Sequence, residues 1–270
     1  MNARLGQSGV VVVDCRFSLT EPEAGRLAYA DGHLPGAVYA HLESDLSRPA
    51  APHEGRHPLP EAAAFTATLA RLGITRDSLV VAYDDQSGAI AARLWWMLQW
   101  IGHPHCRLLD GGLQAWTAAG LPLDKGPVVP HAAAYPPCIP DDSLIVTTEE
   151  MLEFSGVLLD ARAAARFRGE MEPIDPVAGH IPGAQNLPFA ELLDADGCFL
   201  AAAALEQRIA RALPRAADED ETSIVAMCGS GVTACHLIAG LAMTGRRSRL
   251  YVGSWSEWIR DPQRPVANVD

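Results

Sequence analysis

Cys228 opens a short segment, Cys-Gly-Ser-Gly-Val-Thr at residues 228–233, that joins an aliphatic run to an apolar helical stretch. Gly229 and Gly231 allow tight turns with positive φ angles, and such a loop points successive backbone N–H groups inward as an anion cradle. The N-terminus of the following helix adds partial positive charge. Both effects favour the thiolate form of a cysteine, so the segment predicts a nucleophile at Cys228.

The elements around this segment occur twice in the chain. The motif Gly-His-x-Pro-Gly-Ala begins at residue 32 and again at residue 179, and Asp-x-Arg begins at residue 14 and again at residue 160. Further matches follow in the same order near residues 79 and 223 and near residues 112 and 254. Ordered matches of this kind predict a duplicated unit.

Each copy alternates strands with helices. The helical stretches at 89–101 and 232–243 are apolar nearly all round, as helices between a sheet and other structure are. This alternation predicts an α/β fold, in which each copy is a mostly parallel sheet covered by helices on both faces. Short aliphatic runs that predict buried strands lie at residues 10–14, 79–83, 157–160 and 224–227.

A proline-rich connector separates the two copies. Proline fixes φ and withholds a hydrogen-bond donor, so such a segment is extended and semi-rigid. We therefore expect an N-terminal domain at residues 1–125, a linker at 126–145 and a C-terminal domain at 146–270.

The two copies differ at the loop where α/β proteins place their chemistry, the carboxyl end of a strand. Asp84 stands in the first copy where Cys228 stands in the second. Carboxylates of Asp84 and Asp85 would repel an anionic substrate, so we expect the first loop to be non-catalytic. The alternative for Cys228 is a structural cysteine in a glycine-containing turn. The first copy disfavours it, because that copy carries the loop without cysteine.

Composition excludes several classes of function. The chain has 270 residues, of which 49% are hydrophobic, and a net charge of −12, which disfavours a broad nucleic-acid surface. No apolar run approaches the ~18–20 residues that span a bilayer. Nothing marks the chain as secreted, so we expect reduced thiols in the cytoplasm. The cysteine and histidine spacing suggests no zinc site, and we expect neither a metal nor an organic cofactor. The six cysteines are Cys15, Cys106, Cys138, Cys198, Cys228 and Cys235.

The chain resembles the rhodanese family of sulfurtransferases in its tandem two-domain form. The resemblance lies in the order and spacing of four motifs, which are Asp-x-Arg, Gly-His-Ile-Pro-Gly-Ala, the Cys228 loop and Gly-Ser-Trp-Ser-Glu-Trp. The resemblance implies that Cys228 cycles through a persulfide while the first copy forms one wall of the cleft. In phosphatases with the same fold, the loop cysteine is followed by five residues and then by an arginine. Position 234 is Ala234 here, which disfavours phosphate-ester hydrolysis.

Within the family, the loop without basic residues resembles that of members that use 3-mercaptopyruvate. The resemblance implies that Cys228 attacks the substrate sulfur, pyruvate leaves, and a thiol or cyanide accepts the sulfur. A thioredoxin-like reductant is a further candidate acceptor. Two alternatives stay open: thiosulfate as the donor with cyanide as acceptor, and a persulfide carrier with little turnover of small molecules.

The resemblance also implies roles for other residues. Arg166, or Arg162 in its place, would bind the substrate carboxylate, since a guanidinium fork suits that group. Family members that use mercaptopyruvate often carry a second arginine in a Glu-Pro-x-Arg segment, but residues 172–176 read Glu-Pro-Ile-Asp-Pro. His57 and Glu43 would relay a proton with Ser230. The loop residues that would surround the bound substrate are Gly229, Gly231, Val232 and Thr233.

Overall fold

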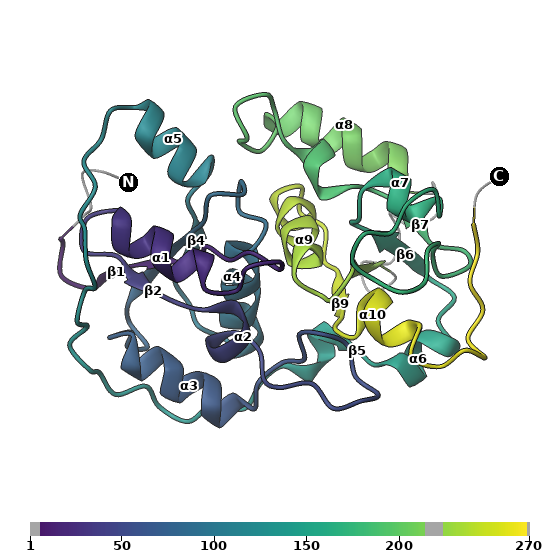
Figure 1. Cartoon of the computed structure of the whole chain (residues 1–270), viewed down its shortest axis with the longest axis horizontal. Coiled ribbons are helices and arrows are strands. Elements are labelled where there is room, and N and C mark those ends of the chain that lie inside the picture. The colour runs from purple at the N-terminus through teal and green to yellow at the C-terminus, as the bar shows by residue number, and fades with distance from the viewer. Residues whose placement is uncertain (1–5, 214–223, 269–270) are drawn as a thin grey trace. The chain divides into compact units, whose positions relative to one another are not determined.

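The computed structural model describes residues 6–213 and 224–268, and the chain divides into two compact units (Figure 1). Each unit takes in a short segment from the opposite half of the chain. The first unit comprises Met1–Arg48, Leu59–Asp141 and Ala195–Cys198, and the second comprises Pro49–Pro58, Asp142–Asp194 and Phe199–Asp270. We call Pro49–Pro58 the arm, because it carries His57 into the second unit.

The first unit is built on a parallel sheet with the strand order β2-β1-β3-β4. Its strands are β1 (Val10–Asp14), β2 (Val38–Tyr39), β3 (Leu79–Tyr83) and β4 (Cys106–Leu108). Its helices are α1 (Ala24–Asp31), α2 (Leu42–Asp45), α3 (Ala62–Arg71), α4 (Ala91–Trp100) and α5 (Gly112–Ala118).

The second unit repeats this plan with the strand order β5-β9-β8-β6-β7, again all parallel. Its strands are β5 (Ile145–Val146), β6 (Val157–Asp160), β7 (Gln185–Asn186), β8 (Ile224–Met227) and β9 (Arg249–Tyr251). Its helices are α6 (Thr148–Leu152), α7 (Ala164–Phe167), α8 (Ala202–Ala212), α9 (Thr233–Met243) and α10 (Ser254–Trp258), with 3-10 turns η2 (Asp142–Leu144) and η3 (Phe189–Leu192).

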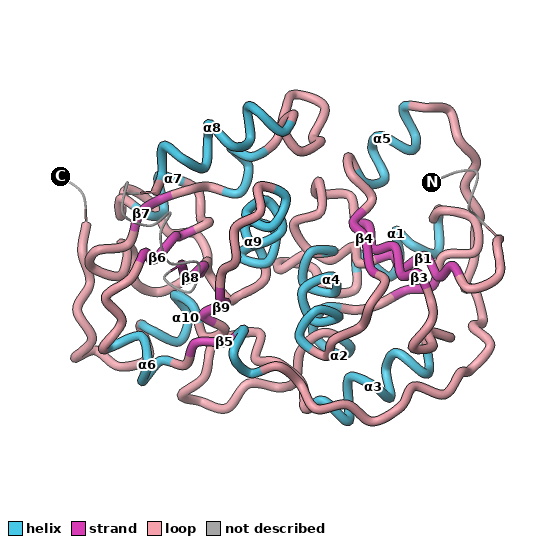
Figure 2. Tube along the Cα trace, turned by 180° about the vertical axis from the view of Figure 1, so that it is seen from behind, coloured by secondary structure: helices cyan, strands magenta, loops and turns pink. Residues whose placement is uncertain are grey.

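The strands of each unit lie among its helices (Figure 2), which confirms the predicted α/β fold. The four strands predicted from aliphatic runs appear with the predicted bounds as β1, β3, β6 and β8. The two apolar stretches form α4 and α9, whose first residues come slightly later than predicted. Before α4 the reason is visible, since the N–H groups of Ile90 and Ala91 are bound by the Asp84 carboxylate. No helix in the described parts of the chain is long and apolar enough to cross a membrane.

The core of the second unit lies directly under the cysteine loop. Val225 and Met227 of β8 pack with Tyr251 of β9 and with Trp255 of α10, and all four side chains are fully buried. β8 is the central strand of its sheet, so its carboxyl end is held from both sides. A loop that starts there begins from a rigid point of the fold.

Candidate functional site

Cys228 follows the last residue of β8 and is itself 2% exposed. Three hydrogen bonds from the start of α10 fix the loop. The Cys228 N–H donates to Ser254 Oγ at 3.1 Å, while the N–H groups of Trp255 and Ser256 donate to the carbonyls of Cys228 (3.0 Å) and Gly229 (2.9 Å). Ser254 has a φ of 52°, an uncommon angle for a residue with a side chain. The cysteine is thus held by contacts of its own backbone.

The two loop glycines have different roles. Gly231 has a φ of +74°, and a Cβ there would lie 2.6 Å from the Val252 carbonyl oxygen, so only glycine fits. The prediction of a positive φ is wrong for Gly229, which lies outside the left-handed region. A Cβ on Gly229 would instead lie 3.0 Å from Nη2 of Arg56 and 3.6 Å from Nη2 of Arg166. The absence of a side chain at residue 229 therefore admits two guanidinium groups to the loop.

His57 and Ser230, for which the resemblance implies a shared proton relay, are hydrogen-bonded to each other. His57 Nδ1 and Ser230 Oγ lie 2.7 Å apart, and the imidazole tautomer decides which of them donates. Both residues are buried, at 3% and 6% exposure. A buried imidazole bonded to a hydroxyl can hold or deliver a proton two residues from Cys228.

The arm that carries His57 is bonded to α10, the helix that also fixes the cysteine loop. The Gly55 N–H donates to Glu257 Oε2 at 3.1 Å, and the Arg56 N–H donates to Ser256 Oγ at 3.1 Å. Glu257 Oε1 also accepts a hydrogen bond from the Thr148 hydroxyl. One short helix therefore sets the relative positions of the cysteine loop and the arm.

Arg166 and Arg56 share two buried carboxylates beside the loop, and Arg162 Nη1 lies 3.6 Å from one of them, at Glu172 Oε2. Arg166 Nε donates to both carboxylate oxygens of Glu172, at 3.0 and 2.9 Å, and its Nη2 donates to Asp175 Oδ2 at 3.1 Å. Arg56 Nη1 is bonded to the other oxygen of Asp175. The side chains of Glu172 and Asp175 are each 3% exposed, and those of Arg166 and Arg56 are 15% and 25% exposed. The carboxylates thus form the base of the cluster, and the guanidinium groups keep access to a ligand.

Opposing effects set the pKa of Glu172. Burial alone would raise the pKa of this carboxyl, but the hydrogen bonds from Arg166 and from the backbone N–H groups of Asp175 and Ile174 together hold it below its usual value. Glu172 therefore stays ionised at neutral pH and keeps Arg166 oriented.

Arg162, the alternative substrate ligand, lies in a structural ion pair. It binds Asp160 through Nε and Nη2, donates to the Gly179 carbonyl at 2.7 Å, and its guanidinium lies 4.6 Å from the ring centroid of Trp255. Its side chain is 1% exposed. Arg16 of the first unit makes the same contacts with its own Asp-x-Arg aspartate and with a glycine carbonyl. Because the arrangement recurs in the copy without cysteine, these contacts favour a structural role for Arg162.

Val232 and Glu43, two further predicted site residues, belong to different units. Val232 is 5% exposed and stands at the N-cap position of α9, which begins at Thr233. Glu43 belongs to the first turn of α2 in the first unit, and its side chain is exposed. A relay between Glu43 and His57 stays a prediction.

Arg56 is a candidate site residue that the sequence did not predict. It precedes His57, but nothing in the local spacing connects it with Asp175, which lies 119 positions further along the chain. Within the described ranges, no group of three or more His, Cys, Asp or Glu side chains is arranged to hold a metal ion.

The equivalent loop of the first unit shows what this loop geometry binds. The Asp84 carboxylate is fully buried and accepts four backbone N–H groups, at 2.7–2.8 Å. Burial raises the pKa of Asp84, and the four hydrogen bonds oppose that rise. We expected Asp84 to repel an anionic substrate, whereas the carboxylate itself occupies the anion position. The donors are the backbone N–H groups of Gln86, Gly88, Ile90 and Ala91.

Comparisons with known proteins identify the family of this chain. The family model described as "Rhodanese-like domain" matches residues 1–119 and 146–261. A Pseudomonas aeruginosa protein named "Probable 3-mercaptopyruvate sulfurtransferase" is 50% identical over 99% of this chain and 95% of its own length. The thiosulfate sulfurtransferase of Gallus gallus is 32% identical over 97% of this chain and 91% of its own length.

A solved structure gives the same result. The 3-mercaptopyruvate sulfurtransferase from Leishmania major superposes with a TM-score of 0.82 at 34% identity, over 93% of this chain and 70% of that one. Two family matches, one over each half of the sequence, account for the duplicated motifs and for the two similar sheets. The chain belongs to the rhodanese family and carries two rhodanese-like domains in tandem.

Proposed function

We propose that this protein is a sulfurtransferase that takes the sulfur of 3-mercaptopyruvate onto Cys228 and passes it to a thiol or to cyanide. The observation that carries the choice of donor is the buried hydrogen bond of 2.7 Å between His57 and Ser230. The leaving group of 3-mercaptopyruvate needs a proton, and this pair can supply one beside the nucleophile.

In the first half-reaction, the Cys228 thiolate attacks the sulfur of 3-mercaptopyruvate and forms a sulfur–sulfur bond. The carbon–sulfur bond breaks, and its electron pair stays on the carbon as the enolate of pyruvate. Protonation of that carbon, with the proton supplied through the His57–Ser230 pair, gives pyruvate. The sulfur that remains on Cys228 is a persulfide.

Thiosulfate makes a different demand on the site. Attack of the Cys228 thiolate on its outer sulfur releases sulfite, which is a stable anion and needs no proton. A buried acid–base pair is therefore useful for 3-mercaptopyruvate and dispensable for thiosulfate. The similarity to the thiosulfate sulfurtransferase of Gallus gallus keeps thiosulfate as the second candidate donor.

The charges beside the loop also support 3-mercaptopyruvate. Arg166 and Arg56 can each direct N–H groups to a carboxylate, and Arg56 supplies a second arginine that residues 172–176 lack. Glu172 and Asp175 already offset these two positive charges. A site so balanced suits the single carboxylate of 3-mercaptopyruvate better than dianionic thiosulfate.

Two further aspects of the proposal concern the acceptor and the compartment. A thioredoxin-like reductant is the corresponding protein acceptor, because it would return the persulfide to the thiol. The cytoplasm is the proposed compartment, since Cys228 must be kept reduced between turnovers.

The test is steady-state kinetics with 3-mercaptopyruvate and with thiosulfate, using cyanide or a dithiol as the acceptor. Wild type is compared with Cys228→Ser and with Cys138→Ser, a matched control at a half-buried cysteine outside the loop. We expect a higher kcat/KM for 3-mercaptopyruvate, no turnover in Cys228→Ser and normal turnover in Cys138→Ser.

Each contrary outcome identifies one error. A higher kcat/KM for thiosulfate would show that the donor is wrong while the nucleophile stands. Activity in Cys228→Ser would exclude Cys228 as the nucleophile. An enzyme that accepts sulfur but does not turn over would be a persulfide carrier.

A further inference from the structure

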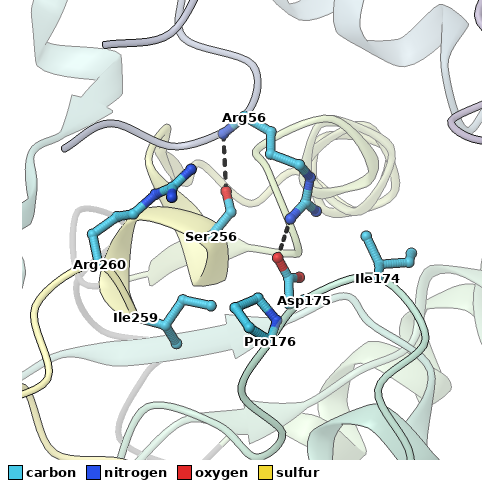
Figure 3. Close-up of a pocket in the computed structure, with 7 residues that line it drawn as sticks. All are labelled: Arg56, Ile174, Asp175, Pro176, Ser256, Ile259 and Arg260. Atoms are coloured by element: carbon cyan, nitrogen blue, oxygen red, sulfur yellow. Dashed lines mark hydrogen bonds and ion pairs between the residues drawn. The ribbon is translucent and has the colours of Figure 1, made fainter. Parts of the chain in front are cut away.

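A cavity of about 370 Å³ lies in the second unit beside the cysteine loop (Figure 3). We infer that it is the binding site of the sulfur acceptor, and that it takes a small thiol that carries a carboxylate. The inference rests on the proposed function of Cys228 as the residue that carries the persulfide. The lining includes Arg56, Asp175, Ser256 and Arg260, together with the apolar side chains of Ile174 and Ile259.

The cavity adjoins the residue that follows the nucleophile. Ser256 lines the cavity, and its N–H donates to the Gly229 carbonyl at 2.9 Å. Arg56 also lines the cavity, and its Nη2 lies 3.0 Å from the position that a Cβ on Gly229 would occupy. Gly229 follows Cys228 directly, so a thiol bound in the cavity lies next to the persulfide loop.

The lining has an excess of positive charge. Arg56 and Arg260 contribute two guanidinium groups, whereas Asp175 is the only acidic residue of the lining. Asp175 is already bonded to Arg56 and to Arg166. The cavity therefore favours an anion over a neutral or cationic ligand.

Both arginines retain donors for that anion. Arg260 forms no ion pair within the described residues, and its Nε donates to the Glu54 carbonyl at 3.3 Å. Arg56 binds Asp175 through Nη1, and its side chain is 25% exposed. Figure 3 shows the Arg260 side chain extending toward Ser256 and Arg56. A carboxylate between the two guanidinium groups would satisfy donors that the protein leaves open.

The size and the apolar walls identify the rest of the ligand. Ile174 is 45% exposed and can cover the methylene groups of a short aliphatic thiol. A volume of this order suits a small molecule and excludes a folded protein from the cavity itself. The ligand class is thus a short thiol that ends in a carboxylate.

The chemical step transfers one sulfur atom. The acceptor thiolate attacks the outer sulfur of the Cys228 persulfide, and a new sulfur–sulfur bond forms. The bond between the two sulfurs of the persulfide breaks, and Cys228 leaves as a thiolate. The acceptor is oxidised from thiol to persulfide, the enzyme persulfide is reduced to thiol, and the proton of the persulfide stays on the transferred sulfur.

The test isolates this second half-reaction. Wild type, Arg260→Gln and the control Arg208→Gln are loaded with sulfur from inorganic polysulfide, so that loading does not depend on 3-mercaptopyruvate. Arg208 of α8 carries the same charge but pairs with Glu191 of η3, and neither residue lines the cavity. Each persulfide is then discharged with 3-mercaptopropionate or with its amide, and the remaining persulfide is measured by cyanolysis. Each discharge rate is divided by the concentration of the acceptor's thiolate form before the two thiols are compared.

We expect Arg260→Gln to lower the rate with 3-mercaptopropionate by roughly tenfold or more, as loss of a charge-assisted hydrogen bond does. The rate with the amide should stay unchanged, and Arg208→Gln should match wild type with both thiols. Equal losses with the two thiols, or no loss, would overturn the inference.

A second measurement covers the case in which Arg260→Gln does not fold. On the wild-type enzyme, propionate should slow discharge to 3-mercaptopropionate, and propionamide at the same concentration should not. Equal effects of the two competitors would overturn the inference. The donor and the acceptor site can fail separately. If polysulfide loads the enzyme but 3-mercaptopyruvate does not, the proposed donor is wrong. The acceptor site still stands in that case if discharge of the polysulfide-loaded enzyme shows the carboxylate preference.

Discussion

The imidazole Nδ1 of His57 and the hydroxyl oxygen of Ser230 are hydrogen-bonded at 2.7 Å across 173 positions of sequence. The bond is possible because the arm Pro49–Pro58 belongs to the second unit, although the rest of its repeat folds in the first. The hydrogen-bonded pair therefore combines one residue of each repeat within a single compact unit.

The His57–Ser230 pair should act as one device. We expect His57→Gln and Ser230→Ala each to lower kcat with 3-mercaptopyruvate by about 10²-fold, and the double variant to lose little more. Loading from thiosulfate should change by less than about threefold, since sulfite needs no proton from this general acid. Kinetics of the four proteins with both donors provide the measurement. Additive losses, or equal losses with the two donors, would contradict the assignment.

The three arginines of the site should separate into two groups. Arg166→Gln and Arg56→Gln should each raise KM for 3-mercaptopyruvate by about tenfold, because each removes charge-assisted donors. Arg162→Gln should instead lower the free energy of unfolding by about 3–5 kcal/mol, since it leaves the buried Asp160 without its partner. KM values and urea unfolding distinguish the groups. A stable Arg162→Gln enzyme with a raised KM would restore Arg162 as a substrate ligand.

The two loop glycines should respond differently to alanine. Gly231→Ala forces a side chain into a φ of +74° and against the Val252 carbonyl, so we expect a loss of about 1–3 kcal/mol in stability together with loss of activity. Gly229→Ala meets only the ends of the flexible Arg56 and Arg166 side chains. It should keep its stability and show a raised KM. Thermal unfolding and kinetics of both variants test this, and similar instability in the two would be inconsistent with it.

Glu257 should act as a positioning residue for the arm. Glu257→Ala removes the acceptor of the Gly55 N–H, so His57 is held less firmly and kcat should fall by about tenfold. Glu257→Gln keeps an acceptor oxygen and should recover most of that activity. The effect should also vanish when His57 is already replaced by Gln. A loss that persists in the His57→Gln background would indicate a structural role.

Acid should weaken the second unit through Glu172. The pKa of Glu172 in the folded protein lies below the unfolded value of 4.5, so the unfolded chain binds the proton more readily. The stabilisation is present above 4.5 and is lost as pH falls through the folded pKa. Urea unfolding across this range should show a decrease in wild type and a shallower decrease in Glu172→Gln. Identical slopes would show that Glu172 makes no contribution.

The sequence was sufficient for the elements that depend on local pattern. The aliphatic runs form β1, β3, β6 and β8, and the loops that follow β3 and β8 carry the aligned Asp84 and Cys228. The positions of Arg56 and Gly229 were not predictable, because they follow from contacts between segments more than a hundred residues apart. The different exposure of Arg162 and Arg166 was not predictable for a similar reason. Both follow Asp160 closely in sequence, and tertiary packing buries the first and leaves the second accessible.

The arm is encoded in the first repeat but belongs to the second unit, and this affects how such proteins can be cut into fragments or recombined. A fragment cut at the proline-rich connector would keep Cys228 but lose Arg56 and His57, which are encoded in the other half. Conversely, the N-terminal fragment would lose Ala195–Cys198, which belongs to the same compact unit. Two homologues can therefore exchange halves successfully only when each half is compatible with the short segment that it receives from the other. This requirement couples the evolution of the repeat without cysteine to that of the repeat that carries it.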